Sequence, residues 1–193
     1  MPFVQTMKAL KGLRDRRQES ALLFSKIDAN GDNKACHSEM AAFVASNANL
    51  WHMLTVNLGM SEPRCHAVAT RVTMELATGL EGPQALLATV NKHQFHQFRQ
   101  KYMLNGHGNQ EFFHRCVFAA FDMDHNSFLD LEELDELLET FYKADSIFQG
   151  DMRLPDKKEE LKRMILEKYD TENLGKLSFD KVRGIISGTA TCK

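Results

Sequence analysis

The sequence has few residues that interrupt helices. Only 4 prolines and 11 glycines are spread over 193 residues, and the alternation of apolar and polar residues that is typical of strands is nearly absent. Long stretches instead carry apolar residues three and four positions apart, the spacing of one helix face. The sequence therefore predicts an all-α fold.

Signals for membranes and secretion are also lacking. No apolar run is long enough to cross a bilayer, so we expect no transmembrane segment. Residues 1–5 lack the apolar core of a secretory signal, and Pro2 stands where myristoylation requires glycine. The 4 cysteines are scattered along the chain and form no close pair, which favours reduced thiols. Together these absences predict a cytoplasmic protein.

Strong charge and catalytic motifs are missing as well. The formal net charge of -2 gives no reason to expect a nucleic-acid partner. The chain contains no glycine-rich phosphate loop and no nucleophile elbow. We therefore expect that it is not an enzyme.

What the sequence does contain is a segment that recurs in register. An apolar pair ends on an aspartate three times, at Asp28, Asp122 and Asp170. Twelve residues after each aspartate begins an apolar triad spaced i, i+3, i+4, typical of an exiting helix. These triads are Met40, Phe43 and Val44; Leu134, Leu137 and Leu138; and Val182, Ile185 and Ile186. An ordinary bundle would give one such match by chance, whereas three in one register predict helix–loop–helix units.

One polar loop runs from Asp122 to Glu133. Calcium takes six to eight oxygen ligands at ~2.4 Å, and a twelve-residue loop supplies them from positions 1, 3, 5, 7, 9 and 12. Position 6 is Ser127, where glycine would adopt a positive φ without strain, so the affinity is expected to be somewhat reduced. The expected ligands are Asp122, Asp124, Asn126, the Phe128 carbonyl, Asp130 and a bidentate Glu133.

A second loop, from Asp28 to Glu39, offers a weaker set. Asn33 at position 6 tolerates the left-handed region better than most residues. Cys36 at position 9 is a soft sulfur, so a water must fill that coordination place. We therefore expect two calcium ions per chain, with the tighter one in the Asp122 loop. The expected ligands of the weaker site are Asp28, Asn30, Asp32, the Lys34 carbonyl and Glu39.

Two further loops lack calcium ligands. In the loop Asp170–Lys181, Leu174 stands at position 5 and Lys181 replaces the closing acid. The partner of the Asp28 loop is predicted around Val90, with Gln94 in place of the closing glutamate. Both units are expected to be metal-free and to support the binding units.

These features resemble the EF-hand superfamily from about residue 17 to residue 188. The strongest part is the pattern Asp-x-Asp-x-Asn-x-x-x-Asp-x-x-Glu that begins at Asp122. Two pairs of units, with a long stretch of chain between the first two units, look like the sarcoplasmic calcium-binding proteins, the calflagins and the coelenterazine-binding proteins. The resemblance implies two pairs of EF-hand units, over residues 1–104 and 110–193. Short β contacts are expected between paired loops, at Leu129 and Leu177 in the second pair and at Ala35 and Val90 in the first.

The sequence leaves three functions open: a calcium sensor that acts on a protein target, a calcium buffer, and a calcium-regulated carrier of a small hydrophobic ligand. A sensor is favoured because both competent loops lack the sixth-position glycine and each has a metal-free partner, which hinders tight cooperative buffering. A zinc site is a weaker alternative, because no cysteine pair or acidic cluster completes four ligands around His93, His96, His107 and His114.

Overall fold

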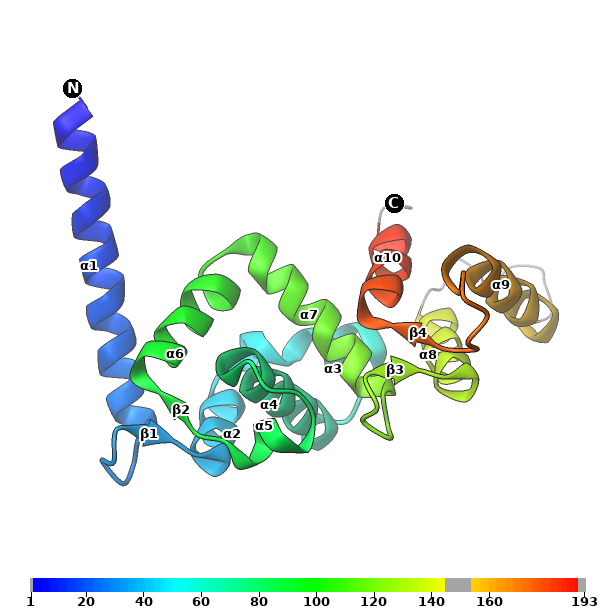
Figure 1. Ribbon diagram of the computed structural model, residues 1–193, viewed down its shortest axis with the longest axis horizontal. Helices are drawn as coiled ribbons and strands as arrows, with labels where there is room; N and C mark the ends of the chain where they lie inside the picture. Colours follow the sequence, from blue (N-terminus) through cyan, green and yellow to red (C-terminus); the bar gives the residue numbers. More distant parts are fainter. Residues whose placement is uncertain (1, 145–153, 191–193) are drawn as a thin grey trace.

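The computed structural model describes residues 2–144 and 154–190, and it confirms the all-α fold. Ten α-helices follow one another in these ranges, and the strands are four segments of two residues each. The elements form four helix–loop–helix units, arranged as two pairs (Figure 1). No helix in the described ranges is long and apolar enough to cross a membrane.

The N-terminal pair joins two units through one antiparallel contact. Its strands place Ala35 opposite Val90, as the sequence predicts. The first unit consists of α1 (Pro2–Ile27), β1 (Lys34–Ala35) and α2 (His37–Ser46). The second consists of α4 (Glu62–Thr78), α5 (Pro83–Leu87), β2 (Val90–Asn91) and α6 (Lys92–Phe98). The 3-10 turn η1 (Ala48–Leu50) and α3 (His52–Leu58) connect the two units.

The C-terminal pair repeats this arrangement with a shorter connection. Leu129 lies opposite Leu177 in its antiparallel contact, again as predicted. The third unit consists of α7 (Gly106–Phe121), β3 (Phe128–Leu129) and α8 (Leu131–Ala144). The fourth consists of α9 (Leu154–Tyr169), β4 (Leu177–Ser178) and α10 (Phe179–Ala190).

The second unit departs from the others in its loop. Helix α4 ends at Gly79, whose φ of +72° belongs to the left-handed region that glycine adopts without strain. The short helix α5 then lies between α4 and β2, in the part of the chain where the other units have their loops. Helix α6 begins with a capping box, in which Asn91 Oδ1 accepts from the Gln94 amide at 3.0 Å and Gln94 Oε1 accepts from the Asn91 amide at 2.9 Å. Gln94 thus has the place in its helix that Glu39 and Glu133 have in theirs, with an amide instead of a carboxylate.

The predicted apolar triads lie in the core of both pairs. In the N-terminal pair, the rings of Phe24 and Phe43 pack on Phe95 with centroids 5.7 and 5.3 Å apart. In the C-terminal pair, Phe118 meets Phe179 edge to face at 5.7 Å. Nearly all triad residues are buried, and Ile185 is partly buried against the core.

The two pairs pack directly against each other. A π-helical turn, η2 (Arg99–Met103), continues α6 and lies against the start of α7. A Cβ at Gly108 would meet the Lys101 carbonyl oxygen at 1.7 Å, so only glycine permits this approach. Phe98 and Phe112 also meet across the junction, with ring centroids 6.0 Å apart. The interval between the predicted halves, residues 105–109, therefore forms the beginning of α7 rather than a separate linker.

Candidate metal centre

The Asp122 loop connects α7 to α8 in a tight turn that contains two non-glycine residues at positive φ. Ser127, at position 6, has a φ of +67°, and His125 has a φ of +61°. A side chain in this region costs roughly 1–2 kcal/mol per residue. The turn therefore has the expected shape, and it is strained at the position where the sequence lacks glycine.

Three acidic side chains of this loop converge. Ligand oxygens of Asp122, Asp124 and Glu133 lie within 4.8 Å of one another. Asp122 is 1% exposed and Glu133 is 7% exposed, so two of these carboxyl groups are buried. Asp122 Oδ1 is itself buried and has no hydrogen-bond partner among the described residues. Since a buried charged oxygen without a partner is costly, this geometry fits a hard cation.

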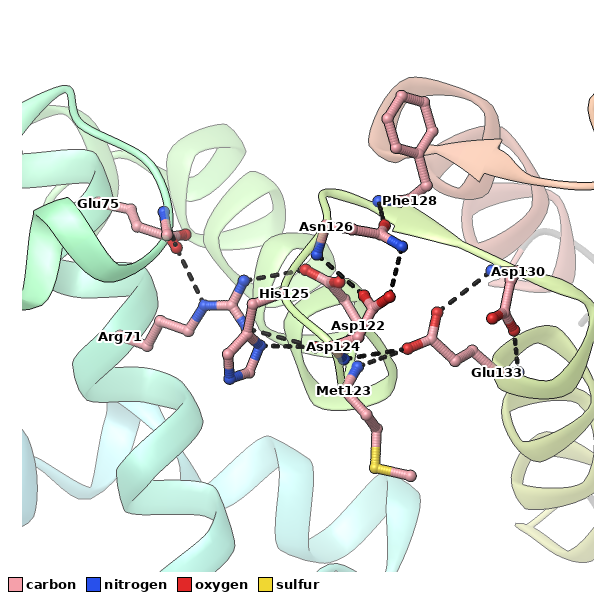
Figure 2. Close-up of polar contacts among 11 residues, drawn as sticks. Arg71, Glu75, Asp122, Met123, Asp124, His125, Asn126, Phe128, Asp130 and Glu133 are labelled. Atoms are coloured by element: carbon pink, nitrogen blue, oxygen red, sulfur yellow. Dashed lines mark hydrogen bonds and ion pairs between the residues drawn. The ribbon is translucent and has the colours of Figure 1, made fainter.

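Glu133 closes the loop from the first turn of α8. Its Oε1 accepts from the backbone amide of Met123 at 2.7 Å, and its Oε2 accepts from that of Asp130 at 3.2 Å (Figure 2). Both oxygens of the expected bidentate ligand are thus held by the loop backbone. A cation in the loop would share these oxygens with the amides.

The other expected ligands shape the turn and the helix that follows. Asn126 Oδ1 accepts from the Phe128 amide at 2.8 Å, and Asn126 Nδ2 donates to Asp124 Oδ2 at 2.7 Å. Asp130 Oδ1 accepts from the amides of Glu132 and Glu133 at 2.9 and 3.0 Å, which caps the start of α8. Position 9 therefore serves the helix as well as the loop.

A further charged residue at this centre, Arg71 of α4, could not be found from the spacing of the loops. Its Nη2 donates to Asp122 Oδ2 at 2.9 Å, and its Nε donates to Glu75 Oε1 at 3.0 Å (Figure 2). Its Nη1 also contacts His125, whose Nδ1 lies 2.9 Å from the Asp122 carbonyl oxygen. The side chains of Arg71 and Asp122 are only 10% and 1% exposed. A buried ion pair therefore joins the first loop ligand to the N-terminal pair.

In the Asp28 loop, backbone amides of the loop itself donate hydrogen bonds to the acidic side chains. Asp28 Oδ1 accepts from the Asp32 amide at 3.1 Å, and Asp28 Oδ2 accepts from the Asn33 amide at 2.9 Å. Glu39 Oε1 accepts from the Ala29 amide and Oε2 from the Cys36 amide, both at 2.9 Å. Asn33 has the expected positive φ, +63°.

Hydrogen bonding from the Cys36 backbone, and then from its side chain, lowers the pKa of Glu39, so this ligand is readily ionised. The other predicted ligands also brace the turn: Asp32 Oδ1 accepts from the Lys34 amide at 2.8 Å, and Asn30 Oδ1 accepts from the Asp32 amide at 2.9 Å. Within the described residues, only the Asp122 loop brings three acidic or histidine ligand groups close together. The histidines considered for zinc belong to no such group there.

In the fourth loop, as in the Asp28 loop, the first aspartate accepts hydrogen bonds from backbone amides of its own loop. Asp170 Oδ1 accepts from the Leu174 amide at 3.0 Å, and Oδ2 accepts from the Gly175 amide at 2.8 Å. Lys181 lies near the start of α10, at the position where Glu133 closes the third loop. This loop has the turn of an ion site without its ligands.

The paired units, the twelve-residue turns and the β contacts at position 8 together define the architecture. The chain has the EF-hand fold. No family model matches it, and no curated protein matches it.

Solved structures of EF-hand proteins resemble this chain only distantly. Calcium-loaded apo-aequorin from Aequorea victoria is 16% identical, with 89% of this chain and 87% of that chain covered and a TM-score of 0.33. A calcium-binding protein from Streptomyces coelicolor, which acts in calcium-mediated regulation, is 16% identical. The match covers 92% of this chain and 99% of that chain, with a TM-score of 0.32. At such TM-scores, these likenesses carry no weight for function, which has to be inferred from the loops themselves.

Proposed function

We propose that the chain binds calcium in the Asp122 loop and, more weakly, in the Asp28 loop, and that calcium changes its conformation so that it acts as a sensor on a protein partner. The observation that supports this best is the convergence of Asp122, Asp124 and Glu133, together with a buried Asp122 Oδ1 that has no hydrogen-bond partner among the described residues. A group of oxygens with two buried carboxylates favours a hard divalent cation over a soft metal.

The difference between the two loops supports the order of affinity. The Asp122 loop offers four acidic ligands, because Asp130 stands at position 9. The Asp28 loop offers three, because Cys36 stands at that position. Each Asp28 carboxylate oxygen accepts one backbone amide of the loop and keeps a lone pair for an ion, so the smaller number of carboxylates is what distinguishes this loop. We therefore expect calcium to fill the Asp122 loop first.

The contacts of Glu133 support a conformational switch. A bidentate grip on calcium draws both Glu133 oxygens toward the ion and changes their hydrogen bonds to the amides of Met123 and Asp130. Glu133 lies in the first turn of α8, so the start of that helix is drawn with it. Leu134, Leu137 and Leu138 follow on that helix and are fully or almost fully buried. Movement at the start of α8 therefore changes the packing of apolar side chains. Exposure of such side chains is how calcium sensors present a surface to a partner.

The test is a calcium titration with a dye that fluoresces on apolar surfaces, combined with hydrogen exchange, in excess magnesium. We expect the dye signal to rise with calcium and exchange to change along α8. Glu133→Gln is the matched control, because it keeps the side-chain volume and weakens the grip on the ion. An unchanged dye signal, with exchange slowed only inside the loops, would make the protein a buffer.

A further inference from the structure

The first ligand position has different partners in different loops. Asp28 and Asp170 direct both carboxylate oxygens to amides of their own loops, at 2.8–3.1 Å. Asp122 instead binds Arg71 through Oδ2 and leaves Oδ1 without a partner. The Asp122 carboxylate is the most buried of the three, at 1% exposure. Its counter-charge therefore comes from outside its own loop.

Arg71 is held firmly on α4, about two turns before that helix ends. Its Nε donates to Glu75 at 3.0 Å, and Glu75 Oε1 also accepts from the Gly82 amide at 3.2 Å. Glu75 therefore ties Arg71 to the loop that follows α4 in the metal-free second unit. Through these contacts, the first ligand of the third loop is connected to the end of α4.

We propose that Arg71 is an internal counter-ion of Asp122 that competes with calcium, so that filling the Asp122 loop loosens α4 of the N-terminal pair. This inference rests on the proposed calcium binding by the same loop and names its regulation. In the calcium-free protein the guanidinium neutralises a carboxylate that would otherwise be buried without a partner. When calcium binds, the carboxylate shares its charge with the ion, and the ion repels the guanidinium.

The direction of the effect follows from linkage. If calcium weakens the contact between Arg71 and Asp122, that contact must weaken calcium binding by the same factor. Glu75 moderates the competition, because it neutralises part of the charge of Arg71. Removing Arg71 should therefore raise the calcium affinity of the loop, and removing the charge of Glu75 should lower it.

The chain carries its own reporter of α4. Trp51, the only tryptophan, lies edge to face against His66 of α4, with ring centroids 4.4 Å apart. His66 and Arg71 lie in the same helix, so a shift of α4 changes the surroundings of the indole. Trp51 also immediately precedes α3, which contacts α4, α7 and α8, so its fluorescence responds to movement of α4 against the C-terminal pair.

The experiment measures calcium affinity by competition with a chromophoric chelator, and follows Trp51 fluorescence in the same titration. All proteins carry Glu39→Gln, so that the measured calcium affinity is that of the Asp122 loop alone. Arg71→Met removes the competing charge and keeps the aliphatic part of the side chain. Arg64→Met is the matched control, because Arg64 also joins α4 to α7, by donating to the Ala120 carbonyl at 2.8 Å, but touches no loop ligand. Its other contact, an ion pair with Glu136 of α8 at 3.7 Å, is solvent-exposed and therefore weak.

We expect Arg71→Met to raise the calcium affinity roughly tenfold, within the usual range of coupling between sites, and to abolish the calcium-dependent change of Trp51 fluorescence. Arg64→Met should leave both unchanged. Glu75→Gln should lower the affinity and keep the fluorescence change. This opposite sign allows the test to proceed even if Arg71→Met does not fold.

Three results would overturn the inference. An unchanged or reduced affinity in Arg71→Met, with the fluorescence change intact, would show that Arg71 does not compete with calcium. Equal effects of Arg64→Met and Arg71→Met would show that any bridge between α4 and α7 acts in this way. Absence of calcium binding in both the parent and Arg71→Met would overturn the proposed function, and this inference with it.

Discussion

The Asp28 loop and the Asp122 loop have the same length and the same acids at positions 1 and 12, but their first ligands are stabilised differently. Asp28 is held by the amides of Asp32 and Asn33, inside one loop. Asp122 is held by Arg71, which lies 51 residues earlier in the chain. The first loop is therefore self-contained, whereas the third loop depends on packing between the two pairs.

Position 9 extends this comparison. Asp130 caps α8 through the amides of Glu132 and Glu133, so the ligand loop and its exiting helix share one carboxylate. Cys36 precedes α2 at the same position, and its sulfur lies 3.1 Å from Ser38 Oγ. One carboxylate thus gives the third unit a ligand and a helix cap, whereas the first unit has a thiol at that position, in a capping box with Glu39. Small changes at equivalent positions can therefore separate two loops of similar sequence.

The largest expected effect comes from the closing glutamates. Glu133→Gln should weaken the tighter calcium step by about 100-fold, because a bidentate carboxylate becomes a neutral amide. Glu39→Gln should weaken only the other step. Calorimetric titration of the two variants separates these outcomes. Loss of the tighter step in Glu39→Gln instead would reverse the order of the two loops.

A smaller effect on calcium affinity is expected when position 9 of the Asp28 loop receives the aspartate that the Asp122 loop has there. Cys36→Asp should strengthen calcium binding by the Asp28 loop about tenfold, since it adds a fourth carboxylate. The same change should stabilise the calcium-free protein by about 0.5–2 kcal/mol by capping α2. Calcium titration and urea unfolding measure the two effects separately. Cys36→Ser controls for the loss of the thiol, and a gain of affinity in that variant would contradict the role of the carboxylate.

The smallest effect concerns strain at position 6. Ser127→Gly should stabilise the calcium-free protein by about 0.5–1 kcal/mol, because it relieves a positive φ of +67°. Asn33→Gly should change the free energy of unfolding by only a few tenths of a kcal/mol, since asparagine tolerates this region. Urea unfolding in a calcium chelator measures both variants. Equal stabilisation by both changes would show that residue type does not set the strain.

Much of the fold could be predicted from the sequence because it depends on local spacing. The apolar triads, the positive φ at Asn33 and Ser127, and the pairing of Leu129 with Leu177 all follow from positions within one twelve-residue register. The pairing of Ala35 with Val90 was predicted even though the second loop has lost its ligands. An apolar residue at the strand position was sufficient.

The contacts between the pairs could not be predicted in this way. Arg71 belongs to a helix whose apolar pattern says nothing about which residue its polar face meets, and its partner is distant in sequence. The same holds for Gly108, which the sequence marked only as part of a break, although it allows α7 to approach the Lys101 carbonyl. The ligand assignments, the two ions per chain and the absence of enzymatic activity stay predictions.

The measurement that tests the central claim most directly is a nuclear magnetic resonance titration that follows the sixth-position amides of the two loops separately. Calcium is added in small steps to isotope-labelled protein in excess magnesium. We predict that the Ser127 resonance completes its change before that of Asn33, with one equivalent of calcium consumed in each stage. A change of Asn33 first, or no change of Ser127, would contradict the claim that the Asp122 loop is the principal calcium site.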